Sequence, residues 1–164
     1  MKQLYIKQKV MSFKDKFTIK DQQENDAYYV EGSFMKIPKT FSILNTAGTE
    51  VALITKKVMS FLPKFYVEVN GQEVLTINKA FSLLKARYSI DAAGIEVHGN
   101  WWDMNFEVFQ YGEAVGKVNK EWFTWGDSYK VQVLNEEMET IIIALVIAID
   151  CVKADQASSP PATT

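Results

Sequence analysis

Residues 141–149, IIIALVIAI, form an apolar run without a single polar position, and this run limits the folds that the chain can adopt. A membrane span needs about 20 apolar residues, so we expect this shorter run to be buried inside protein. Isoleucine and valine favour a buried strand, but three glutamates precede the run and Lys153 follows it, which matches the charge preference of helix ends. We therefore predict a helix over about 136–153. A helix that is apolar on every side has to be enclosed by protein.

The rest of the chain carries the sequence signals of β-hairpins. Two nearly identical segments, KVMSFKDKF at 9–17 and KVMSFLPKF at 57–65, each lead into residues that alternate between apolar and polar. After the second segment, Asn70-Gly71 separates two such stretches, and this pair tolerates the positive φ angles of a type I′ turn. We predict a hairpin there, further hairpins at 17–34 and 87–98, and a last strand at 128–134.

A nine-residue pattern, G-x-x-V-x-x-[I/V]-x-K, recurs in three of the expected hairpins, at 48–56, 71–79 and 112–120. Side chains alternate between the two faces of a regular strand, so apolar positions three residues apart point to opposite faces. A β-bulge between them would instead bring both to one face. The sequence leaves both arrangements open.

These elements together predict a mainly β fold. Many short strands separated by turn signals are typical of an antiparallel sandwich or barrel. The enclosure that a small β protein offers to an apolar helix is the inside of a barrel. We expect one domain over residues 1–155, since a chain of 164 residues suits a single core. The tail at 156–164 lacks large apolar side chains, and we expect it to be disordered.

Lysines are concentrated in the first half of the chain. Residues 1–87 hold 14 basic and 8 acidic side chains, whereas residues 88–164 hold 4 basic and 12 acidic ones, and the net charge is −2. This split predicts one basic and one acidic side. We expect the lysines of the repeated hairpins, Lys56 included, to point outward. Under one interpretation they only keep the protein soluble and prevent strand edges from associating. Under the other they bind anionic lipid head groups, and the candidate ligand-binding residues are then Lys14, Lys16, Lys57 and Lys64.

Residues that usually carry catalysis or metal binding are scarce. The chain has one histidine, His98, and one cysteine, Cys151, so no pair at zinc-ligand spacing exists. Ser82 and Lys85 match the Ser-x-x-Lys pattern, but they lie between expected strands and not on the helix that this pattern needs. We expect no catalytic residue, no metal site and no cofactor. A lone cysteine cannot form an internal disulfide, which fits a cytoplasmic location.

Five segments resemble the bacterial, YxjI-type members of the LURP-one-related family: LYIKQKVMSFKDKFTIKD at 4–21, YYVEGSF at 28–34, FLPKFYVEVNGQEV at 61–74, KEWFTWGDSYKVQV at 120–133 and ALVIAIDCV at 144–152. The resemblance covers about residues 1–153. That family is similar in fold to the C-terminal domain of tubby proteins and to phospholipid scramblases. The resemblance therefore implies a closed antiparallel barrel of nominally twelve strands around a hydrophobic C-terminal helix.

The resemblance also bears on function, because tubby relatives bind phosphoinositide head groups and scramblase relatives are associated with membranes. Together with the charge split, it leads us to expect a non-enzymatic domain that binds anionic phospholipid head groups. Such a protein would be cytoplasmic and peripheral at the membrane. The alternatives are a lipid-handling or other enzyme with a site at the barrel mouth, and a protein-interaction scaffold. Nucleic acid is not expected as a partner, because the chain lacks an overall positive charge.

Overall fold

The computed structural model describes residues 1–7, 16–33, 38–59, 62–80, 87–92, 94–123 and 126–158. The described part consists of strands β1 (Lys2–Lys7), β2 (Phe17–Asp21), β3 (Asp26–Gly32), β4 (Lys39–Asn45), β5 (Glu50–Met59), β6 (Leu62–Val69), β7 (Gln72–Ala80), β8 (Arg87–Ala92), β9 (Ile95–Asn100), β10 (Asn105–Gln110), β11 (Glu113–Phe123) and β12 (Gly126–Val133), then a 3-10 helix η1 (Glu136–Met138) and helix α1 (Glu139–Ser158).

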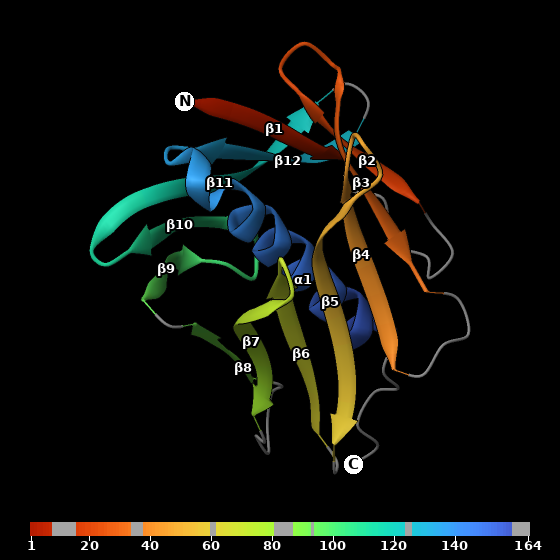
Figure 1. Cartoon of the computed structure of the whole chain (residues 1–164). Coiled ribbons are helices and arrows are strands. Elements are labelled where there is room, and N and C mark those ends of the chain that lie inside the picture. Colours follow the sequence, from red (N-terminus) through yellow and green to blue (C-terminus); the bar gives the residue numbers. More distant parts are fainter. Residues whose placement is uncertain are drawn as a thin grey trace.

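The twelve strands form one antiparallel sheet that curls around α1 (Figure 1). The strand order is β8-β7-β6-β5-β4-β3-β2-β1-β12-β11-β10-β9, so most strands pair with their neighbours in the sequence. Pairing of β1 with β12, from Lys2↔Val133 to Lys7↔Ser128, joins the two halves of the sheet. The expected mainly β barrel around a C-terminal helix is confirmed, and the barrel is nearly closed.

The barrel has an open seam between β8 and β9, and here one prediction was wrong. Within the described residues, β8 pairs with β7 and β9 pairs with β10, so residues 87–98 do not form the expected hairpin. The chain does turn at the expected place, where Gly94 has a φ of 70°. A turn signal shows where the chain changes direction, but it does not decide which strand supplies the hydrogen-bond partners. Here β7 and β10 supply them.

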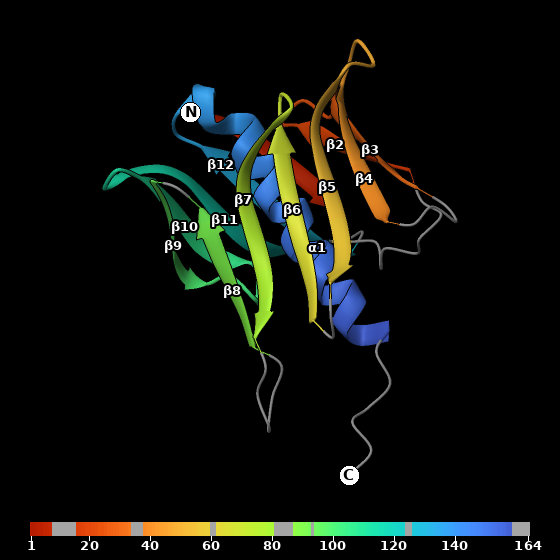
Figure 2. The ribbon, with the colours of Figure 1, turned by 60° about the horizontal axis from the view of Figure 1, so that its bottom comes forward.

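Helix α1 lies inside the barrel, and Figure 2 shows its last turns at the end of the barrel where β5 ends. Every side chain from Ile142 to Ile149 has an exposed fraction of zero. The helix lies nearest to β5 and β6. Inward-facing side chains of the strands, such as Ile54, Val67 and Ile77, complete the same core. The predicted enclosed helix is therefore confirmed.

The start of the helical segment is fixed by polar contacts. The Asn135 side chain accepts a hydrogen bond from the Glu137 N–H at 3.0 Å, which satisfies one of the free donors at a helix start. Glu139, only 7% exposed, accepts hydrogen bonds from Lys2 Nζ at 2.7 Å and from the Tyr28 hydroxyl at 2.6 Å. Burial and the bond to Glu139 raise the pKa of Tyr28. Two donors therefore share one oxygen, Oε1, of this buried carboxylate.

The helix ends later than predicted. It continues to Ser158, five residues beyond the expected end at 153, so residues 156–158 belong to the helix and not to a tail. The sequence pattern stops at the last large apolar side chain, whereas an ion pair between Asp155 and Lys56 holds a further turn against β5. Residues 159–164, the remainder of the expected tail, lie outside the described residues.

The valine of the recurring nine-residue pattern occupies a β-bulge in all three copies. Opposite β5, the consecutive residues Ile43 and Leu44 pair with Ala52 and Glu50, which leaves Val51 without a partner position. The partner strands skip Val74 in β7 and Val115 in β11 in the same way. Of the two arrangements that the sequence left open, the bulge is the correct one. Bulges bend a strand and increase its twist, which a sheet needs in order to close around a helix.

Two-residue turns connect β6 to β7 and β10 to β11. Asn70 and Gly71 have φ angles of 51° and 77°, so both central residues are left-handed, as a type I′ turn requires. Tyr111 and Gly112 adopt nearly the same angles, 48° and 84°. The turn predicted from Asn70-Gly71 is thereby confirmed.

We predict that Leu145→Ala lowers the free energy of unfolding by about 2–5 kcal/mol, because it leaves a cavity in a filled interior. Leu134→Ala is the matched control: Leu134 is 49% exposed, whereas Leu145 is fully buried. An exposed substitution of this kind changes stability by about 0.5 kcal/mol or less. Urea denaturation followed by tryptophan fluorescence measures both values. Similar losses in the two variants would contradict an enclosed helix.

Candidate functional site

Two of the four candidate lysines, Lys57 and Lys64, lie directly opposite each other on β5 and β6. Both side chains are exposed. The Lys57 ammonium lies 5.0 Å from the centre of the Tyr66 ring, within the range of a cation–π contact. Like charges that face each other across two strands destabilise a sheet. A bound anion would relieve this repulsion.

Lys16 lies on another part of the barrel. Its Nζ is 3.0 Å from Oε1 of Glu31, although 77% of its side chain is exposed. Three strand pairs, from β2 to β5, separate Lys16 from Lys57, and the offset across the strands alone is about 14 Å at their usual spacing. Lys14 lies outside the described residues. The structure therefore brings together two of the four candidates.

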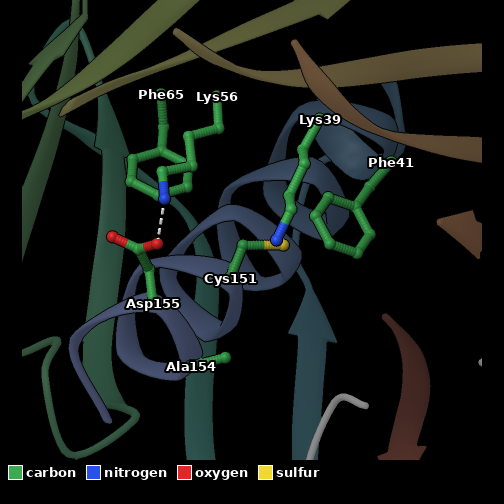
Figure 3. A pocket seen from close by; sticks show the side chains of 7 residues that line it. All are labelled: Lys39, Phe41, Lys56, Phe65, Cys151, Ala154 and Asp155. Carbon is green, nitrogen blue, oxygen red and sulfur yellow. Dashed lines mark hydrogen bonds and ion pairs between the residues drawn. The ribbon is translucent and has the colours of Figure 1, made fainter. Parts of the chain in front are cut away.

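A second lysine pair lies beside the first but faces the interior of the barrel. Lys39 on β4 and Lys56 on β5 are directly opposite each other. They line a pocket at the end of the barrel, with two phenylalanines and the last turns of α1 (Figure 3). The complete lining is Lys39, Phe41, Lys56, Phe65, Cys151, Ala154 and Asp155.

The inward direction of Lys56 corrects the expectation that the hairpin lysines all point outward. Ile54, two residues earlier on the same strand, is fully buried, and Phe41, two residues after Lys39, is also buried. Residues two apart share a face of a strand, so alternation from these apolar neighbours was a signal that could have placed both lysines inside. A lysine near the strand end can face inward because its ammonium reaches the open end of the barrel.

The pocket is narrow and its charges are partly paired. Lys56 forms an ion pair with Asp155, and their side chains are only 21% and 13% exposed. Cys151 is buried in the core, and burial raises the pKa of its thiol, which keeps it in the unreactive thiol form. The enclosed space holds about one water molecule. It is a niche for a small group and not a cavity for a whole substrate.

The two pairs together form one basic cluster, Lys39, Lys56, Lys57 and Lys64, which we call the rim cluster. Lys56 and Lys57 are consecutive, so they connect the inner pair to the outer pair. Asp155 is positioned to neutralise one of the four charges. The C-terminal end of α1, which carries a partial negative charge, lies beside the inner pair and attracts it. Within the described residues, no acidic side chain is paired with the outer lysines, whose side chains are exposed.

Other site chemistry in the described part of the chain is limited. Among these residues, no group of three or more histidine, cysteine or acidic side chains is arranged to hold a metal ion. His98 lies on β9 with its Nε2 2.8 Å from Oε2 of Glu96, and both side chains are exposed. Ser82 and Lys85 lie outside the described residues. None of the described helices is long and apolar enough to span a membrane.

The family model described as LURP-one-related matches residues 2–150. The chain belongs to the LURP-one-related family. A relative from Bacillus subtilis (strain 168), "Uncharacterized protein YxjI", is 32% identical over 152 residues, which cover 93% of this chain and 94% of the relative. The X-ray structure of an Arabidopsis thaliana protein covers 92% of this chain and 91% of its own, with a TM-score of 0.60 and 15% identity. At that identity the likeness shows the fold alone.

In this LURP-one-related protein, another acidic side chain of α1, Asp150, is partly buried and bonds to the opposite part of the barrel. The Tyr129 hydroxyl, on β12, donates a hydrogen bond to Oδ1 of Asp150 at 3.1 Å. Burial raises the pKa of Asp150 to about 6, against the opposing effects of Tyr129 and Lys153. The folded protein therefore binds a proton at Asp150 more tightly than the unfolded chain does.

We predict that Asp150→Asn stabilises this LURP-one-related protein at pH 7. The pKa of Asp150 is raised in the folded state, so its contribution to stability is greatest at acidic pH and falls as pH rises from about 4 to about 6. Asparagine keeps an acceptor for Tyr129. Because it carries no titrating carboxyl group, it also removes the loss of stability that accompanies ionisation of Asp150. Thermal melts of both proteins across that range should show a difference in melting temperature that grows as pH rises. A difference of constant size, or a less stable variant at pH 7, would contradict the assignment.

Proposed function

We propose that this protein is a non-enzymatic domain that binds anionic phospholipid head groups at a membrane surface through the rim cluster. The observation that supports the proposal best is the Lys57–Lys64 pair, in which two exposed ammonium groups face each other across one strand ladder. This arrangement costs stability in the isolated protein. An anion between the two lysines converts that repulsion into two attractions.

The inner pair suits the same ligand chemistry. Lys39 and Lys56 line a niche with room for about one water-sized atom, such as one phosphate oxygen, while the rest of a head group stays outside. Phe41 and Phe65 provide apolar walls next to these charges. An apolar wall beside ammonium groups matches the boundary between acyl chains and head groups. A cytoplasmic protein that is peripheral at the membrane would meet such a surface.

The expected affinity is modest. A lysine near an anionic membrane surface contributes about 1 kcal/mol, so three or four lysines give attachment in the millimolar range, and a specific head-group contact brings it toward micromolar. Charge screening shortens the reach of such attraction from about 10 Å at 0.1 M salt to about 3 Å at 1 M. Binding should therefore decline steeply as salt is added.

We predict that the protein co-sediments at low salt with phosphatidylcholine vesicles that contain phosphatidylserine or a phosphoinositide. The double variant Lys57→Gln/Lys64→Gln should lose most of this binding and keep its melting temperature or raise it slightly, because it removes a like-charge contact. Lys20→Gln/Lys117→Gln is the matched control. It changes the net charge equally, but its lysines are already paired with Asp26 and Glu107.

Two results would contradict the proposal. One is equal binding to neutral and anionic vesicles, which would indicate insertion of apolar side chains instead of charge recognition. The other is equal loss of binding in the rim-cluster and control variants, which would indicate a dependence on net charge alone.

A further inference from the structure

Among the strands of the described residues, β9 has an edge without a partner strand, and its backbone groups are set to pair with another strand. It is the last strand of the sheet, with β10 on one side. The Tyr111 N–H donates to the Gly94 carbonyl at 2.9 Å, which makes these two residues a hydrogen-bonded pair of the β9–β10 ladder. Such pairs alternate along an antiparallel ladder. Residues 96 and 98 therefore bond to β10, and Ile95 and Val97 direct their N–H and C=O groups to the open edge. Gly99, with a φ of 111°, departs from regular strand geometry.

The packing of Gly99 agrees with this alternation. A Cβ atom on Gly99 would lie 3.1 Å from the Phe106 Cα. Residues that face each other without exchanging hydrogen bonds have the closer Cα atoms in an antiparallel ladder. Gly99 and Phe106 are such a pair by register. Within the described residues, no backbone hydrogen bond joins the outer edge of β9 to another strand.

β9 also lacks three of the features that prevent edge strands from associating, namely proline, lysine and a β-bulge. Its sequence, Ile95-Glu-Val-His-Gly-Asn100, contains no proline and no lysine, and its register with β10 runs without a bulge. Ile95 and Val97 are half-buried and face the barrel, whereas Glu96 and His98 are exposed on the outer face. An edge of this kind is open to strand addition.

We propose that β9 pairs with β9 of a second copy of this chain to form a symmetric dimer. A two-fold axis at Val97 places Val97 opposite its own copy, and both residues then exchange the N–H and C=O groups that point outward. In this register Glu96 lies opposite His98 of the second copy, and Ile95 lies opposite its Gly99. The outer face thus joins a carboxylate to an imidazole twice. Two-fold dimers are the commonest symmetric assemblies.

Charge supports a second copy as the occupant of this edge. Glu96 and His98 already interact within one chain, with a separation of 2.8 Å between their polar atoms. The two-fold axis at Val97 repeats that complementary contact between chains. A net charge of −2 per chain sets up little overall repulsion between copies. β9 is not one of the strands β4, β5 and β6 that carry the rim cluster, so this proposal does not depend on lipid binding.

Sedimentation velocity of the full chain, from micromolar to millimolar concentration, tests the proposal. We expect a monomer–dimer equilibrium. Val97→Pro removes the outward N–H on each copy and should raise the dimer dissociation constant by about tenfold or more, since two hydrogen bonds are lost. Proline is tolerated on an edge strand where the N–H faces outward. Val97→Ala keeps the N–H and should preserve the dimer. Thermal melts verify that each variant is folded.

A charge exchange tests the register itself. Glu96→Lys places a lysine opposite His98 of the second copy and should weaken the dimer several-fold. Glu96→Lys combined with His98→Glu places a lysine opposite a glutamate of the second copy and should recover dimerisation. The proposal is overturned by a monomer at every concentration. It is equally overturned by a dimer that is unaffected by Val97→Pro, or by a double exchange that fails to recover what the single exchange loses.

Discussion

The burial of α1 is the interaction on which the rest of this structure depends. Eight consecutive side chains of the helix are completely removed from solvent, and a fully buried leucine or isoleucine stabilises the fold by about 1.5–3 kcal/mol. Without the sheet, the helix would expose all of this apolar surface. Without the helix, the inward-facing residues of the strands would surround an unfilled space. The two parts therefore have to form together, and the charged contacts at each helix end, Lys2–Glu139 and Lys56–Asp155, fix its position in the barrel.

Much of this arrangement could be predicted from the sequence, because the relevant constraints are local. An apolar run with acidic residues before it indicates an enclosed helix, and Asn70-Gly71 indicates a type I′ turn. The repeated spacing of three that begins at Val51, Val74 and Val115 was visible in the sequence. Whether it marked a β-bulge was not, because the choice between a bulge and a regular strand depends on the partner strand. The seam between β8 and β9 was missed for the same reason, since residues 87–98 alone do not indicate that their partners are β7 and β10.

The candidate site was predictable only in part. Composition identified the lysine-rich half of the chain, and the structure places Lys57 opposite Lys64. Lys16 instead lies three strand pairs away, because sequence distance carries no information on position around a barrel. The inner lysines were missed because charged side chains are expected to face solvent. Asp155, five residues after the partly buried Asp150, could not be matched to Lys56 without the register of the barrel and the length of α1.

Native-state hydrogen exchange, resolved to single amides, tests the central claim most directly. If α1 is enclosed by the sheet, its amides between Ile142 and Ile149 become accessible only when the whole barrel opens. Their exchange free energies should then equal the free energy of global unfolding measured with denaturant. Amides at the edge strand β9 should exchange at much lower free energy. Exchange of the Ile142–Ile149 amides well below the global value, with the central strands still protected, would show a helix that leaves the barrel independently and would contradict the account.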